Sequence, residues 1–157
     1  MRLDWASLLD LLKSRERFVL TSHVRPDCDA LGSELGLAGI LESLGKDVRI
    51  VNAQSTPPSL AWIDPERRIE SLADKVRPAD LADRDLFVVL DTSAWAQLGA
   101  MGDVAKSMRD RVVVIDHHVS EDDLCDMWFK DTSAEATARI VYEIGLRLRV
   151  PFTERIA

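Results

Sequence analysis

All three histidines of the chain lie close to aspartates, in short polar segments that follow apolar runs. These residues are His23, Asp27, Asp29, Asp116, His117 and His118. A further aspartate, Asp91, ends the apolar run LFVVLD. Imidazole nitrogens and carboxylate oxygens together form a donor set that favours Mn²⁺ and also suits Mg²⁺, Co²⁺ or Fe²⁺. The sequence therefore predicts a divalent-metal site, on condition that these segments meet in space.

The chemistry that such a site suits is hydrolysis of a phosphate ester. This reaction needs a hydroxide near neutral pH and positive charge beside the phosphoryl oxygens, and two divalent ions roughly 3.5–4 Å apart supply both. The first polar segment also leads directly into a predicted helix, with Gly32 and Ser33 near its start. Free backbone N–H groups and the helix dipole favour an anion at that place. We therefore expect Gly32 and Ser33 to help bind a substrate phosphate.

The elements that must bring these segments together alternate between strands and helices. Apolar, β-rich runs predict strands over residues 17–22, 47–52, 86–91 and 111–116. Helical periodicity predicts helices over residues 4–15, 30–44 and 133–149, and residues 60–84 are expected to be irregular with short helical pieces. Continuous apolar strands suit a sheet that is buried on both faces, so we predict an α/β fold with a doubly wound, mainly parallel sheet and helices on both faces. Ligands of such sheets bind outside the carboxyl ends of the strands, where the polar segments would converge.

Charge and composition limit the partners of the protein. The net charge of −7 argues against a broad basic surface for duplex nucleic acid, whereas metal ions could still hold a small anionic substrate. No apolar run approaches the roughly 20 residues of a membrane-spanning helix. The N-terminal segment is amphipathic and differs from a signal peptide. We therefore expect a cytoplasmic protein that binds neither duplex nucleic acid nor membranes.

Several of these segments resemble the motifs of the DHH family of phosphoesterases. Residues 23–33, HVRPDCDALGS, match the family pattern HxxPDxDAxGS, and Asp91 matches the aspartate of the second motif. The triplet Asp116-His117-His118 is the one that names the family. Residues 131–138, DTSAEATA, resemble a further segment of bacterial oligoribonucleases (nanoRNases) and 3′-phosphoadenosine-5′-phosphate phosphatases. The resemblance covers about residues 15–150 and implies the N-terminal domain of a RecJ-like phosphoesterase.

The resemblance also implies a role for each metal ligand. His23 and Asp27 would hold one ion, while Asp29 and His117 would hold the other. Asp91 would bridge the two ions and position the attacking water. The resemblance thus implies two Mn²⁺ ions as the cofactor.

Other residues near the motifs receive different expectations. His118 would contact the scissile phosphate, and Asp116 would orient a histidine, with direct metal ligation as the alternative. Cys28 occupies a variable position of the family pattern and receives no catalytic role. Thr137 is expected to pack rather than to take part in catalysis. Trp62 and Trp95 are expected to pack in the core or at its rim, with stacking on a nucleobase as the alternative.

For the whole protein, the resemblance implies hydrolysis of short oligoribonucleotides, of 3′-phosphoadenosine-5′-phosphate, or of both. The alternatives are an exopolyphosphatase or inorganic pyrophosphatase of the same superfamily, and a catalytically silent nucleotide-binding or regulatory module. We expect residues 1–157 to form one domain that stops before the family's fourth motif aspartate and C-terminal substrate domain. Such a chain would bind metal poorly and turn over little substrate. The expected partners are a small phosphorylated substrate or a short single-stranded oligonucleotide, and a homodimer is possible.

Overall fold

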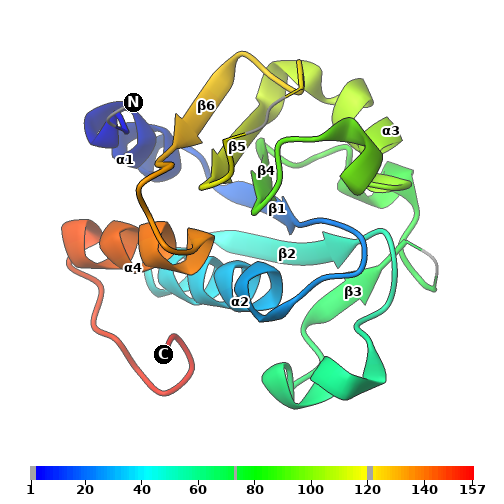
Figure 1. Ribbon diagram of the computed structural model, residues 1–157, viewed down its shortest axis with the longest axis horizontal. Helices are drawn as coiled ribbons and strands as arrows, with labels where there is room; N and C mark the ends of the chain where they lie inside the picture. The colour runs from blue at the N-terminus through cyan, green and yellow to red at the C-terminus, as the bar shows by residue number, and fades with distance from the viewer. Residues whose placement is uncertain (1–2, 73, 120–121) are drawn as a thin grey trace.

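The computed structural model describes residues 3–72, 74–119 and 122–157 and contains one parallel six-stranded sheet (Figure 1). The strands are β1 (Arg17–Thr21), β2 (Asp47–Asn52), β3 (Ile69–Ser71), β4 (Leu86–Leu90), β5 (Val112–Asp116) and β6 (Met127–Lys130). Their order across the sheet is β3-β2-β1-β4-β5-β6, and every neighbouring pair is parallel. The chain therefore reverses its direction of winding between β1 and β4, which is the topological switch point of a doubly wound sheet.

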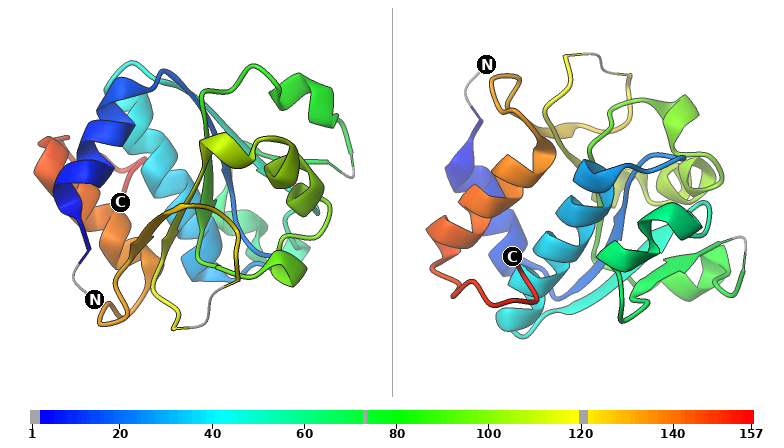
Figure 2. Two further views of the ribbon diagram at one scale, coloured as in Figure 1. Left: turned by 90° about the horizontal axis from the view of Figure 1, so that it is seen from above. Right: turned by 60° about the horizontal axis from the view of Figure 1, so that its bottom comes forward.

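Helices cover both faces of this sheet, as predicted (Figure 2). The α-helices of the described residues are α1 (Trp5–Ser14), α2 (Cys28–Ser43), α3 (Met101–Ser107) and α4 (Thr137–Leu148). Short 3₁₀ helices connect other elements: η1 (Pro58–Ile63), η2 (Pro78–Leu81), η3 (Trp95–Gln97) and η4 (Arg109–Arg111).

Side chains of the central strands alternate between two hydrophobic cores. Phe18 and Val88 face the core that α1, α2 and α4 cover, whereas Val19 and Val89 face the core beneath α3. Both cores contain fully buried side chains, which explains why the strand sequences are apolar without interruption. No helix of the described ranges is long and apolar enough to cross a membrane.

The structure corrects the predicted elements in two respects. The segment 60–84, expected to be irregular, contains the edge strand β3, and two further elements, α3 and the edge strand β6, were not predicted. The last helix begins at Thr137, four residues later than expected. The reason is a turn in which the Asp131 carboxylate accepts hydrogen bonds from the backbone N–H and the hydroxyl of Ser133, at 3.0 and 2.6 Å. Such a local side-chain contact competes with helix formation.

Candidate metal centre

The ends of three neighbouring strands carry the predicted ligands. His23 follows β1, Asp91 follows β4 directly, and His117 and His118 follow β5. These three strands are adjacent, and the switch point lies between the first two. Residues that are up to 95 positions apart in the sequence therefore meet at one edge of the sheet, as the sequence predicted.

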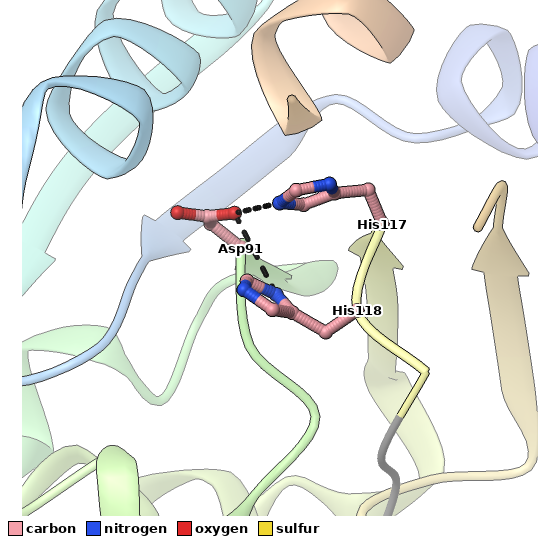
Figure 3. A group of neighbouring side chains, drawn as sticks. All are labelled: Asp91, His117 and His118. Atoms are coloured by element: carbon pink, nitrogen blue, oxygen red, sulfur yellow. Dashed lines mark ion pairs between the residues drawn. The ribbon is translucent and has the colours of Figure 1, made fainter. Parts of the chain in front are cut away.

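Asp91 occupies the centre of this edge. Its Oδ2 lies 3.4 Å from Nε2 of His23, and its Oδ1 lies 3.6 Å from Nε2 of His117. Figure 3 shows the carboxylate beside the imidazoles of His117 and His118, which come from the loop after β5. The Asp91 side chain is 2% exposed, and its backbone adopts the left-handed region with φ of 61°, which aspartate tolerates better than most residues. The two oxygens of one buried carboxylate thus face two different imidazoles.

Both imidazoles are fixed through their other ring nitrogen. Nδ1 of His23 lies 3.0 Å from the carbonyl oxygen of Val24, and Nδ1 of His117 lies 3.2 Å from that of Ala134. A carbonyl oxygen can only accept, so Nδ1 carries the proton in each ring. Nε2 is then the nitrogen that is directed at the carboxylates and that a metal would bind, an arrangement typical of metal-binding histidines.

Asp27 and Asp29 lie at the start of α2, on opposite sides of Cys28. Asp27 caps the helix, because its Oδ1 accepts the backbone N–H of Ala30 at 3.0 Å, and the same oxygen lies 3.9 Å from Nε2 of His23. Asp29 instead accepts two backbone N–H groups at the start of α4, from Thr137 and Ala138, both at 2.8 Å. One aspartate therefore faces the His23 side of the site, and the other joins α2 to α4.

Asp29 also approaches the second imidazole. Its Oδ2 lies 3.7 Å from Nε2 of His117. The structure thus places His23 with Asp27 and His117 with Asp29, and it places Asp91 between the two pairs.

The electrostatic state of these groups follows from their contacts. The Asp91 contact raises the pKa of His23 to about 9, although burial opposes the shift. For Asp91, burial acts to raise the pKa. Contacts with His23 and Thr137 outweigh this effect and leave the pKa of Asp91 below its usual range. Burial, together with the neighbouring Asp91, raises the pKa of Asp29. Metal ligation requires a neutral imidazole, so ion binding would displace the proton of His23.

Asp116 and His118 form a contact of their own at the end of β5. The Asp116 side chain is fully buried, and its Oδ1 lies 2.8 Å from Nδ1 of His118 and accepts the backbone N–H of His118 at 3.1 Å. The His118 side chain is 49% exposed, and its Nδ1 lies 3.9 Å from Oδ1 of Asp91. Asp116 thus contacts His118 directly, and its role in orienting that histidine stays a prediction.

The residues expected to bind phosphate differ in their exposure. Ser33 is fully buried, and its hydroxyl donates to Oδ1 of Asp29 at 3.4 Å. Gly32 is half-buried and lines a cavity of about 400 Å³ between α2 and the C-terminal segment, whose lining also includes Gly36 and Ile156. A Cβ on Gly32 would meet no atom within 4 Å, so close packing does not require glycine there. The direct contacts of Ser33 are with a candidate ligand, and its contact with substrate stays a prediction.

Two expectations for residues outside the ligand set need correction. Thr137 does more than pack: its buried hydroxyl donates to Oδ1 of Asp91 at 2.8 Å, and its backbone N–H binds Asp29. Trp62 was expected to pack but is 71% exposed, whereas Trp95 packs against the core beneath α3. The sequence gives no signal for the contact between Thr137 and Asp91, because that contact depends on the start of α4 lying beside the residue that follows β4.

The donor atoms fit divalent cations. Two sets of three donor atoms, each set within 4.8 Å, occur in the described residues: one from His23, Asp27 and Asp91, the other from Asp91, His117 and His118. Both sets share Asp91, which is the requirement for a bridging carboxylate. In the second set the atom of His118 near Asp91 is Nδ1, which already contacts Asp116, so Asp29 is the better third donor beside His117. The residues present thus suit two neighbouring ions of the oxygen- and nitrogen-binding kind.

Known proteins resemble this chain in sequence and in fold. It is 25% identical over 155 residues to a probable bifunctional oligoribonuclease and PAP phosphatase NrnA of Streptococcus mutans, covering 96% of this chain and 45% of that protein. The NrnA of Bacillus subtilis is 28% identical over 139 residues, which cover 88% of this chain and 41% of that protein. A crystal structure of an exopolyphosphatase-related protein from Bacteroides fragilis superposes with a TM-score of 0.82 and 27% identity, covering 91% of this chain and 43% of that one.

These matches define what the chain is and how far the likeness extends. The chain spans less than half the length of the curated relatives that it matches. The description of the family model that matches residues 17–157 is "DHH family, N-terminal domain". Residues 17–157 include all of the candidate metal ligands, from His23 to His117. The chain therefore belongs to the DHH family, whose N-terminal domain it contains.

Proposed function

We propose that this domain is the metal-binding part of a divalent-metal-dependent phosphoesterase that hydrolyses short oligoribonucleotides, 3′-phosphoadenosine-5′-phosphate or both, by two-metal activation of water. The observation that carries the proposal is the position of Asp91, whose two oxygens face His23 and His117 at 3.4 and 3.6 Å. The NrnA relatives support the substrate class, since their names describe both activities.

The side chains have separate tasks in this proposal. His23 and Asp27, whose side chains are neighbours, would hold one ion, Asp29 and His117 would hold the other, and Asp91 would be a ligand to both. When bound, the ions would supply a hydroxide near neutral pH and neutralise the phosphoryl oxygens. The mixed nitrogen and oxygen donors favour Mn²⁺, with Mg²⁺ or Co²⁺ as substitutes.

The neighbouring residues keep this arrangement in place and face the substrate. Thr137 holds Asp91 from the side of α4, and its backbone N–H fixes Asp29. His118, half exposed at the rim, contacts the scissile phosphate and stabilises the charge that develops there. Its Nδ1 is held by Asp116, so the ring reaches the phosphate through Nε2.

The net charge of −7 supports a small substrate in preference to a long nucleic acid. A short single-stranded oligonucleotide or a small phosphorylated compound needs few contacts beyond the ions. We further propose that the protein works in the cytoplasm, which suits such substrates, and that it can form a homodimer.

A second candidate function is the hydrolysis of polyphosphate or pyrophosphate. The Bacteroides fragilis structure, described as exopolyphosphatase-related, favours this candidate, because it has the same fold over 91% of this chain. Both candidates use the same metal ligands and differ in the leaving group. A catalytically silent nucleotide-binding module would need neither the metal ligands nor a leaving group.

The deciding experiment measures Mn²⁺ binding and hydrolysis together. Isothermal titration of the longer polypeptide, if the gene encodes one, should show two Mn²⁺ ions per chain, whereas the 157-residue chain alone should bind them more weakly. Phosphate or nucleotide release is then followed for a dinucleotide, 3′-phosphoadenosine-5′-phosphate, pyrophosphate and polyphosphate. Turnover of the first two supports the proposal, and turnover of only the last two favours the second candidate. Absence of tight Mn²⁺ binding would contradict both and identify a silent module.

A further inference from the structure

A buried lysine, Lys130, contacts the carboxylate that binds His118, and none of the motifs includes it. Lys130 is the last residue of β6 and pairs in register with Asp116, the last residue of β5. Its side chain is 5% exposed, and its Nζ lies 3.4 Å from Oδ2 of Asp116. Lysine is almost never this deeply buried without a partner, so the position requires an explanation.

Ser93 lies between the two charges. Nζ of Lys130 donates to the Ser93 hydroxyl at 2.9 Å, and that hydroxyl donates in turn to Oδ2 of Asp116. Ser93 is 3% exposed and belongs to the segment that follows Asp91. The contact therefore links the ends of three strands, β4, β5 and β6, on the side of the sheet where α3 packs.

The chemistry of the groups fixes the direction of every hydrogen bond. An ammonium has three donors and no acceptor, so the Ser93 oxygen must accept from Lys130 and turn its own hydrogen toward Asp116. The Asp116 carboxylate then accepts from Ser93 on Oδ2 and from His118 on Oδ1. Nδ1 of His118 is thereby required to be a donor. The hydrogen bonds thus point from Lys130 through Ser93 to Asp116, and the His118 ring donates to Asp116 from the other side.

This directionality has a consequence for the reactive face of His118. Because Nδ1 is committed to Asp116, Nε2 is the ring nitrogen left for a substrate phosphate, and the plane of the ring is fixed. Without Lys130, the Ser93 hydroxyl could rotate, and the fully buried Asp116 would lose its charged partner. His118 would then lose the acceptor geometry that sets its orientation.

We propose that Lys130 is a positioning residue, which acts through Ser93 and Asp116 to fix the orientation and tautomer of His118 at the rim of the metal centre. This inference deepens the proposed function and rests on it for the role of His118. A contribution to folding alone predicts a change in stability and no change in the state of the His118 ring. The two readings therefore differ in an observable that does not depend on turnover.

The test begins with ¹⁵N NMR of the imidazoles, which are well suited because the chain has only three histidines. Two-bond ¹⁵N–¹H couplings in the metal-free or Mg²⁺-containing protein report which ring nitrogen carries a proton. In the wild type we expect His118 to show a protonated, slowly exchanging Nδ1. In Lys130→Met that signal should weaken and the Nε2–H tautomer should appear, whereas Lys130→Arg should restore the wild-type pattern. The matched control is Lys106→Met on α3, whose side chain is 61% exposed.

Loss of Lys130 leaves the buried carboxylate of Asp116 without its cation. The fold of Lys130→Met is therefore checked by circular dichroism before its spectra are compared with those of the wild type. If it does not fold, Ser93→Ala replaces it, since this variant removes the intermediate hydroxyl and keeps both charges. We then expect faster exchange of the Nδ1 proton. An unchanged His118 signal in the folded variant, or a wild type whose Nδ1 carries no proton, would overturn the proposal.

Kinetics and metal binding complete the test. For an active protein, Lys130→Met should lower kcat by about 100-fold, the cost of a small misplacement of a catalytic group, with KM little changed. The affinity for Mn²⁺ should stay within about 2-fold of the wild type. A changed His118 signal with unchanged kcat would refute the positioning role in the reaction. If instead the wild type binds no Mn²⁺ and hydrolyses nothing, the proposed function fails, while the NMR result still decides whether Lys130 sets the His118 ring.

Discussion

The two edges of the sheet use aspartates in opposite ways. At the amino edge, Asp85 accepts the backbone N–H groups of Glu16 and Arg17 and pairs with the Arg17 guanidinium at 3.1 Å. There Asp47 pairs with the Arg84 guanidinium at 2.8 Å. Each of these carboxylates has an arginine, as expected where charge only has to be balanced.

At the carboxyl edge the balance is missing. Within the part of the chain that the structure describes, Asp27, Asp29 and Asp91 form ion pairs only with histidines. A proton on His23, whose pKa is about 9, offsets the charge of one carboxylate, and no lysine or arginine of the described ranges pairs with the other two, so this edge keeps a surplus of negative charge. The difference teaches that Asp47 and Asp85 complete the fold with partners from the polypeptide, whereas Asp27, Asp29 and Asp91 have the charge that our proposal assigns to bound cations.

The largest expected effect comes from the shared carboxylate. Asp91→Asn keeps the shape of the side chain and a residue type that tolerates the left-handed backbone at φ of 61°, so it removes little besides the charge. We expect Mn²⁺ binding to fall from two ions to one or none. Phosphate release from 3′-phosphoadenosine-5′-phosphate should fall more than about 100-fold, because loss of even an outer partner of a metal site costs 10–100-fold.

Cys28→Ala is the matched control for Asp91→Asn, since Cys28 lies between the candidate ligands Asp27 and Asp29 but is exposed and has no assigned role. It should bind two ions and keep nearly all of the activity. Wild-type turnover in Asp91→Asn would show that Asp91 does not bridge the ions.

A second prediction uses the pH dependence of stability. Glu34 on α2 is fully buried, and this burial raises its pKa to about 7, against the opposing effect of Ser22 and Asn52. A carboxyl with a raised pKa holds its proton in the folded state while the unfolded chain releases it. Its contribution to stability is therefore complete below about pH 4.5 and is lost as the pH rises through 7.

Glu34→Gln removes this titration. The variant and the wild type should unfold at similar urea concentrations near pH 4.5, and the variant should be more stable by about 3 kcal/mol above pH 7.5, as the size of the shift implies. Urea unfolding at a series of pH values, in the presence of a chelator, measures the difference. A difference that does not vary with pH would contradict the assignment.

Metal itself should stabilise the folded domain. Mn²⁺ at 100 times its Kd should add about 2.7 kcal/mol for one site, which corresponds to a rise in Tm of about 5–10 °C for a domain of this size. A chelator should reverse the rise, and Asp91→Asn should abolish most of it. The affinity should increase between pH 7 and 9, because His23, with a pKa of about 9, must lose its proton to bind an ion. A Tm that does not respond to Mn²⁺ would argue against the site.

The sequence predicted the parts of the site that depend on strand ends. Asp91 and His117 follow long apolar runs, and a parallel sheet brings such ends together whatever the details of packing. The edge strands β3 and β6 escaped prediction because they contain three and four residues and carry charged side chains, which removes the apolar signal.

The contacts that support the ligands could not be predicted in the same way. Thr137, Ser93 and Lys130 are common polar residues in sequence, and only the packing of α4 and β6 against the central strands buries them. The candidate ligands are histidines and aspartates, which the sequence reveals by their type and spacing, while the residues that contact them are identified by tertiary contacts alone. This is also why Lys130 became visible only in the structure.

The smallest expected effect tests the amino edge. Asp85 is held by Arg17 and by two backbone N–H groups, which lower its pKa, so its contribution is present above its unfolded pKa and is lost as the pH falls. Hydrogen bonds to a charged group contribute about 1.5–3 kcal/mol, and solvent screening at this partly exposed position reduces the expected loss in Asp85→Asn to about 1 kcal/mol at pH 7. Urea unfolding measures that loss, and Asp103→Asn, at a position that is 90% exposed, should show none. Mn²⁺ affinity should be unchanged in Asp85→Asn, because the proposed metal centre lies at the opposite edge. A weaker affinity would mean that the two edges are coupled and that their separation into structural and functional aspartates is wrong.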